Sequence, residues 1–141
     1  MSRLSHLLLG PVLALAASLA VPQAAVAQAM SPADAVEAEL LPGWRLPDGR
    51  HMTALRLRLA PGWKTYWRSP GEGGIAPRFT WRGSRNLDRV VEHWPRPAVY
   101  VDSGLQSLGF KNELILPLEI VPADDAAPVR LRAEVDIGVC E

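Results

Sequence analysis

Cysteine and histidine are scarce in this sequence, and their scarcity excludes several classes of protein. The 141 residues include one cysteine, Cys140, so no framework of internal disulfides can form. Of the three histidines, only His51 and His93 lie beyond the N-terminal segment, and neither has a cysteine or a carboxylate at ligand spacing. We therefore expect no metal site.

An excess of positive charge is also lacking. The sequence holds 15 lysines and arginines against 15 aspartates and glutamates, which gives a formal net charge of zero. Domains that bind nucleic acid normally carry a basic face, because the phosphate backbone dominates their affinity. We expect no nucleic-acid partner.

No apolar run is long enough to span a bilayer comfortably. The longest, residues 7–20, is short and rich in alanine, and it is preceded by basic residues and followed by small residues at alternate positions. This pattern predicts a secretory signal peptide over residues 1–29, cleaved after Ala27 or Ala29, and an exported domain over residues 30–141. An uncleaved membrane anchor is the alternative, and it would need roughly 20 apolar residues.

Helical periodicity is almost absent, and short stretches of alternating apolar and polar residues take its place. The clearest is residues 51–59, where leucines alternate with arginines. Further strands are predicted at residues 36–46 (broken by Pro42-Gly43), 63–68, 77–81, 89–94, 113–121 and 129–139. The last two bracket a polar turn and are predicted to pair as a hairpin, whereas the glycines and proline of residues 69–74 predict an irregular loop. So many short strands indicate an all-β fold, an immunoglobulin-like β-sandwich.

Three other features have both a structural and a functional interpretation. Asp102-Ser103-Gly104 follows an apolar stretch, as in aspartic proteases that share a proton between two carboxylates, but the same residues are common in turns. The five tryptophans either fill the core, which is the favoured interpretation, or form a platform for a ligand. Cys140 is either an inert, small apolar residue or a redox-active thiol.

Five motifs then occur in an order that is typical of one protein family. They are residues 62–71 (GWKTYWRSPG), 77–81 (PRFTW), 94–97 (WPRP), 108–118 (with LGFK and LPL) and Gly138-Val139-Cys140. Together they resemble the amino-terminal periplasmic domain of the thiol:disulfide interchange protein DsbD and its copper-sensitivity-suppressor relatives, over residues 37–141. The resemblance implies an immunoglobulin-like sandwich, in agreement with the strand count.

The resemblance also implies a function. The complete domain would take electrons from a membrane-embedded thiol reductase and pass them to oxidised periplasmic proteins, in cytochrome c biogenesis or copper tolerance, without a small-molecule cofactor. Cys140 would be one half of the redox pair, and the chemistry needs a second thiol to resolve the mixed disulfide. In the family that cysteine lies on the next strand, so we expect this chain to be truncated, to lack its final strand or strands, and to be inactive alone.

A cap loop shields the disulfide in this family. Residues 100–105 match its place, although their sequence differs, and the implied cap residues are Tyr100, Asp102, Ser103, Gly104 and Leu105. The aromatic residues implied to flank the site are Trp63, Tyr66 and Trp67. A shield has a physical purpose, because a reducing dithiol in an oxidising compartment would otherwise react with the wrong oxidant.

Three functions therefore compete. The leading hypothesis is a thiol-disulfide relay domain with Cys140 as a redox thiol. The second is a non-catalytic sandwich that binds a ligand or a protein through its aromatic side chains. The third is a protease that uses Asp102.

Overall fold

The computed structural model describes residues 31–141, and the predicted signal peptide at residues 1–29 lies outside this range. The described residues form these strands: β1 (Val36–Leu40), β2 (Trp44–Arg45), β3 (His51–Leu59), β4 (Lys64–Gly71), β5 (Arg78–Thr80), β6 (Leu87–Glu92), β7 (Ala98–Asp102), β8 (Leu105–Lys111), β9 (Glu113–Pro122), β10 (Glu134–Asp136) and β11 (Val139–Cys140). Among them, no helix is both long and apolar enough to cross a membrane.

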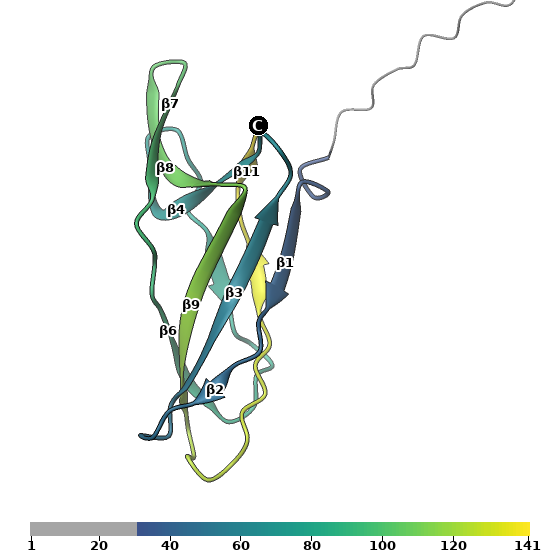
Figure 1. Ribbon diagram of the computed structural model, residues 1–141, viewed down its shortest axis with the longest axis vertical. Coiled ribbons are helices and arrows are strands. Elements are labelled where there is room, and N and C mark those ends of the chain that lie inside the picture. Colours follow the sequence, from purple (N-terminus) through teal and green to yellow (C-terminus); the bar gives the residue numbers. More distant parts are fainter. Residues whose placement is uncertain (1–30) are drawn as a thin grey trace, which may run out of the picture.

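Two main sheets make up the fold. The first has the strand order β1-β3-β9-β6, with β2 also paired to β3, and the second has the order β11-β4-β8-β7. β5 and β10 form a separate two-stranded sheet. Figure 1 shows the hairpin of β7 and β8 extending beyond the rest of the molecule, on the same end as the C-terminus. The predicted all-β, immunoglobulin-like β-sandwich is confirmed.

The core lies on one face of β3 and β9. Because side chains of a strand point alternately to opposite faces, every second residue of β9 is buried from Leu114 onward. The main buried cluster consists of Leu55, Leu57, Leu114, Leu116, Leu118 and Ile120. Four aromatic residues of the opposing segments pack against it in a chain of ring contacts 6.0–6.3 Å between centroids: Phe79, Trp81, Trp94 and Phe110. Most of the tryptophans are thus core residues, as favoured from the sequence, while Trp44 is 61% exposed.

Several predicted strands are confirmed. β3 has the predicted bounds. β2 joins it through a turn at Pro47-Asp48-Gly49, in which the Gly49 amide donates to the Leu46 carbonyl at 3.1 Å. The break at Pro42-Gly43 separates β1 from β2, and both strands pair antiparallel with β3.

The predicted hairpin of residues 113–121 and 129–139 is wrong. β9 lies between β3 and β6, while the later segment bridges Arg85 at Arg130 and then pairs with β5 through β10 and with β4 through β11. The alternation in residues 129–139 is real, because its apolar members pack against the core. Alternation specifies which face of a strand is buried, however, and not which strand pairs with it.

The boundary predicted after residue 68 is also wrong, and two strands were missed. β4 continues to Gly71 through a bulge that shifts its pairing with β8 between Tyr66 and Gly71, which accommodates Pro70 within the strand. β7 and β8 form a hairpin that the sequence analysis did not predict as strands. Their apolar residues are mostly exposed on the part of the hairpin that extends beyond the sandwich, so no clean alternation marks them.

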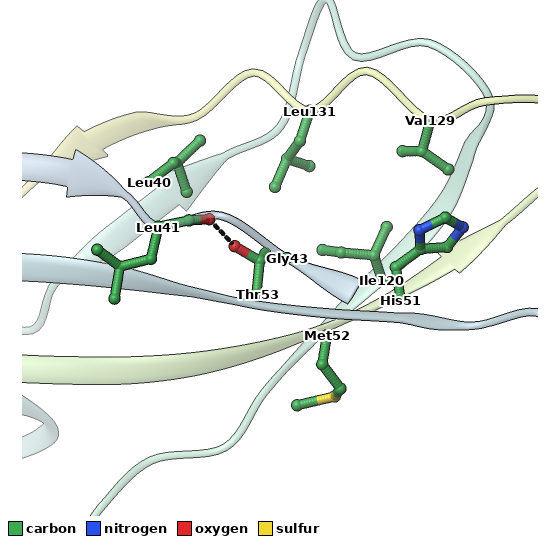
Figure 2. A pocket seen from close by; sticks show the side chains of 9 residues that line it. All are labelled: Leu40, Leu41, Gly43, His51, Met52, Thr53, Ile120, Val129 and Leu131. Carbon is green, nitrogen blue, oxygen red and sulfur yellow. Dashed lines mark hydrogen bonds between the residues drawn. The ribbon is translucent and has the colours of Figure 1, made fainter. Parts of the chain in front are cut away.

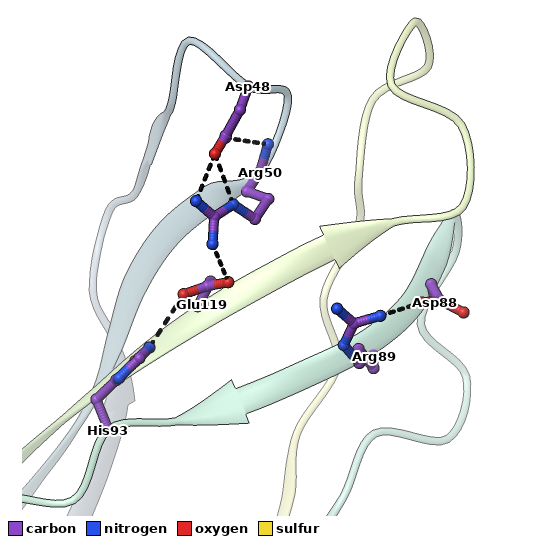
Figure 3. Close-up of polar contacts among 6 residues, drawn as sticks. All are labelled: Asp48, Arg50, Asp88, Arg89, His93 and Glu119. Atoms are coloured by element: carbon purple, nitrogen blue, oxygen red, sulfur yellow. Dashed lines mark hydrogen bonds and ion pairs between the residues drawn. The ribbon is translucent and has the colours of Figure 1, made fainter.

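A network of charged side chains lies on the outer face of the first sheet (Figure 3). Arg50 Nη1 donates to Glu119 Oε1 at 2.5 Å and also pairs with Asp48, while His93 Nε2 lies 3.2 Å from Glu119 Oε2. These hydrogen bonds, chiefly the one from Arg50, hold the pKa of Glu119 below its ordinary value. The network joins the turn before β3, the middle of β9 and the residue after β6.

We predict that Leu116→Ala lowers the free energy of unfolding by about 2–5 kcal/mol, because it leaves a cavity where β3 and β9 meet the aromatic residues. Leu116 is 0% exposed, whereas its neighbour Ile115 is 43% exposed on the other face. Ile115→Ala is the matched control and should cost less than about 1 kcal/mol. Urea unfolding measures both, and equal losses would contradict this core.

We predict that Glu119→Gln lowers the melting temperature at neutral pH. A carboxyl group whose pKa is depressed by folding stabilises the protein above its unfolded pKa, and this contribution disappears as the pH falls through the folded pKa. The difference in melting temperature between the variant and the unaltered protein should therefore be largest at a pH well above the ordinary pKa of 4.5, and it should vanish in acid. Asp88→Asn is the control, since Asp88 pairs only with its exposed neighbour Arg89 at 3.0 Å. A difference that persists in acid would refute the assignment.

Candidate functional site

Cys140 lies in the short edge strand β11, which pairs antiparallel with the beginning of β4. Val139 is opposite Thr65, and Cys140 is opposite Lys64. The hydroxyl of Thr65 donates to the carbonyl of Gly138 at 2.9 Å, which fixes the segment just before the cysteine. Cys140 is exposed, and it is the sole cysteine in the sequence. β4 thus determines where the thiol lies.

A cavity of about 240 Å³ opens beside the thiol. It lies between β4, β11, the loop after β4 and the tip of the β7–β8 hairpin. Its lining residues are Lys64, Tyr66, Gly73, Asp102, Ser103, Leu105, Ser107 and Cys140. Residues from four separate parts of the sequence therefore meet at one thiol.

Tyr66 is the aromatic side chain of this cavity. It is only 7% exposed, because its ring lies between Gly74 and Gly138: a Cβ atom at Gly74 would approach the ring to 2.7 Å, and one at Gly138 to 3.2 Å. Burial raises the pKa of Tyr66, and the charge and hydrogen bond of the neighbouring Cys140 raise it further. The phenol therefore stays protonated and can donate its hydrogen to the sulfur.

The predicted cap loop is the tip of a β-hairpin. Asp102 pairs with Leu105, and the two residues between them, Ser103 and Gly104, have positive φ angles of 53° and 84°. Positive φ at both central residues defines a type I′ turn, which matches the twist of the strands it joins. Asp102, Ser103 and Leu105 face the Cys140 cavity, whereas Gly104 lines a different one.

Lys64 is the site residue that the sequence analysis missed. It is only 5% exposed, and its ammonium forms an ion pair with the carboxylate of Asp102. The hydrogen bond with Asp102 raises the pKa of Lys64 against the opposing effect of burial. The ring of Tyr100 makes a cation–π contact with Lys64, since its centroid lies 5.5 Å from the Lys64 ammonium. The same centroid lies 5.0 Å from the ammonium of Lys111. The sequence did hold one signal for it: Lys64 lies two residues before Tyr66 and therefore on the same face of the strand.

Ser107 was also missed. It is 3% exposed, lines the cavity, and its hydroxyl has no hydrogen-bond partner among the described residues. A buried polar group without a partner is costly, and native structures contain few of them. The hydroxyl oxygen is itself buried, so a molecule in the cavity could reach it only after the surrounding side chains move.

The other two aromatic residues expected beside the thiol do not line the cavity. Trp63 is buried in a second core cluster with Ala35 and Leu59, and Val139 packs against that cluster. Trp67 stacks with the guanidinium of Arg68, whose Cζ atom lies 5.0 Å from the ring. Trp63 therefore supports the strand that carries the cysteine from behind, and Tyr66 alone of the three meets the cavity.

The alternative sites receive no support from this geometry. The carboxylate of Asp102 pairs with an ammonium and not with a second carboxylate, as a protease would require. Within residues 31–141, no three His, Cys, Asp or Glu side chains are grouped so that they could hold a metal ion.

A second cavity, of about 330 Å³, lies near β2, at the end of the sandwich opposite the C-terminus (Figure 1). Figure 2 shows Val129 and Leu131 of the C-terminal segment facing Leu40 and Ile120 across it. Its hydroxyl group is already used, because Thr53 Oγ1 donates to the Leu41 carbonyl at 2.5 Å. We interpret this cavity as an incompletely filled edge of the core.

Known proteins resemble this chain in both sequence and structure. Residues 26–141 match the family described as thiol:disulfide interchange protein DsbD, N-terminal. A solved structure, the N-terminal periplasmic domain of ScsB from Proteus mirabilis, has 33% sequence identity and a TM-score of 0.56, covering 74% of this chain. This chain spans 39% of that structure's length. No curated protein matches. The chain therefore belongs to the family of DsbD N-terminal domains.

Proposed function

We propose that this chain is a periplasmic thiol-disulfide exchange domain that relays electrons from a membrane-embedded thiol reductase to oxidised envelope proteins. Cys140 is one of its two redox sulfurs, and the second cysteine lies beyond the end of this sequence. The observation that carries the proposal is the exposed Cys140 at a cavity enclosed by Tyr66 and the tip of the β7–β8 hairpin, in a chain of the DsbD family.

The exchange proceeds in two steps. A thiolate of the domain attacks one sulfur of the substrate's disulfide, so that a mixed disulfide forms and the other substrate sulfur leaves as a thiolate. The second thiolate of the domain then attacks the domain's own sulfur in that mixed disulfide and releases the second substrate sulfur. Two electrons pass to the substrate, the two released thiolates take up protons, and the domain is left with a disulfide that the membrane partner must reduce.

The residues around Cys140 have matching roles in this proposal. Tyr66 donates a hydrogen bond to the sulfur, and residues 100–105 at the hairpin tip cover one side of it and limit which disulfides reach it. Trp63 holds β11 from behind through Val139.

We predict a second cysteine in the coding sequence shortly after Glu141. Its replacement by serine should make the extended protein accumulate a mixed disulfide through Cys140 with an oxidised envelope protein, because no thiol remains to resolve it. Replacement of both cysteines should abolish the adduct, whereas Met52→Leu, which alters a sulfur remote from the site, should leave exchange unchanged. Non-reducing electrophoresis with mass spectrometry measures the adduct. Absence of a downstream cysteine would end the proposal.

Export is the second part of the proposal. Residues 1–29 act as a cleaved signal peptide, and residues 30–141 form the exported domain; the periplasmic location of the ScsB domain supports this. We predict that protein recovered from the periplasm begins at Gln28 or Met30, as read by N-terminal sequencing. Recovery of the protein with residues 1–29 intact in the membrane fraction would show an uncleaved anchor instead.

A further inference from the structure

The buried ammonium of Lys64 has one carboxylate partner among the described residues, and that partner is on a projecting element. Asp102 stands at the tip of the β7–β8 hairpin, and its side chain is 64% exposed, whereas the side chain of Lys64 is 6% exposed. A buried charge whose partner is removed must find another or be neutralised, because isolated charges are costly in a protein interior.

The sulfur of Cys140 is a possible second partner for this ammonium. Cys140 is directly opposite Lys64 in the antiparallel pairing of β11 with β4, so the two side chains project from the same face of the sheet. Both line the same cavity together with Asp102. The ammonium, the carboxylate and the sulfur therefore border a single cavity.

We propose that the ammonium of Lys64 is shared between Asp102 and Cys140. When the β7–β8 hairpin is displaced, the ammonium loses the carboxylate as its partner and pairs with the sulfur instead. This inference rests on the proposed thiol-disulfide exchange and adds an activating residue to it. Asp102 is a positioning residue that acts through Lys64. A partner that pushes the hairpin aside to reach Cys140 thereby creates the positive environment that stabilises a thiolate, while the closed hairpin withholds it.

The other charged or titratable groups near Cys140 are few. Tyr66 on β4 lines the same cavity, Lys111 on β8 lies over the ring of Tyr100, and Glu141 follows the cysteine on its own segment. Of these, Tyr66 and Lys111 are anchored on strands within the sheet. Asp102 differs because it reaches the site from a hairpin tip.

The test is the pH profile of Cys140 alkylation by iodoacetamide, in which the thiolate forms an S–C bond and releases iodide. Residues 1–141 contain no other cysteine, so the alkylation rate of this 141-residue chain reports Cys140 alone. Asp102→Asn should move the profile to lower pH and raise the rate at neutral pH about 3- to 10-fold, the change that a shift of about half to one pH unit gives. Lys64→Met should move the profile to higher pH. Lys64→Arg, which keeps the positive charge, should give a profile close to that of the unaltered protein.

The double variant separates this mechanism from direct repulsion between Asp102 and the sulfur. In the Lys64→Met background, Asp102→Asn should have little effect, because the carboxylate acts through the ammonium. Glu113→Gln, which breaks the 2.7 Å ion pair with Arg56 on the other sheet, is the control and should alkylate as the unaltered protein does. The same fold-change from Asp102→Asn in both backgrounds, or none in either, would overturn the inference.

This experiment is independent of the proposed exchange function. Alkylation requires neither a second cysteine nor a partner, so a failed exchange assay leaves its result intact. Conversely, exchange that persists while the alkylation profile ignores Asp102 would leave the function standing and remove Lys64 from it. If Lys64→Met fails to fold, Lys64→Gln supplies the uncharged background for the same double variant, and a profile that Asp102→Asn alone leaves unchanged would still overturn the inference.

Discussion

The pairing of β11 with β4 is the constraint on which the candidate site depends. Only Val139 and Cys140 take part in it, with the Thr65 hydroxyl adding one hydrogen bond to Gly138. Because β4 also pairs with β8 on its other edge, the thiol and the hairpin are positioned by opposite edges of a single strand. The inner face of that strand is anchored by the core, and its outer face carries the chemistry.

The charges of the site illustrate how a sandwich can concentrate function on an outer face. Lys64 and Tyr66 are both buried there, although neither faces the core between the sheets, since the loop after β4 and the hairpin cover them. Cover of this kind creates a partly dry environment around the ammonium and the phenol, while the carboxylate of Asp102 lies at its exposed rim. The thiol stands at its margin and is exposed to solvent.

The sequence allowed the fold class, the strand at residues 51–59 and the family to be predicted, because periodicity and ordered motifs are local. It did not allow the partner of residues 129–139 to be predicted, because alternation is the same whichever sheet edge the segment joins. Tyr66, Asp102, Ser103 and Leu105 were placed near the thiol through the family resemblance. The ion pair of Lys64 with Asp102 joins residues 38 positions apart. They lie on β4 and β7, which meet only through β8, and β7 and β8 were not predicted as strands, so no local signal indicated the pair.

The two glycines that border Tyr66 set the width of a slot. With no side chains at positions 74 and 138, the backbone comes close to the two edges of the phenol ring, with Gly74 on the Cδ1–Cε1 side and Gly138 on the Cδ2–Cε2 side. A methyl group on Gly74 would also collide with Pro70, and one on Gly138 with Ile75. The slot therefore accommodates the full breadth of a six-membered ring. A smaller aliphatic side chain at position 66 would leave part of that breadth empty and would remove the hydroxyl from the cavity.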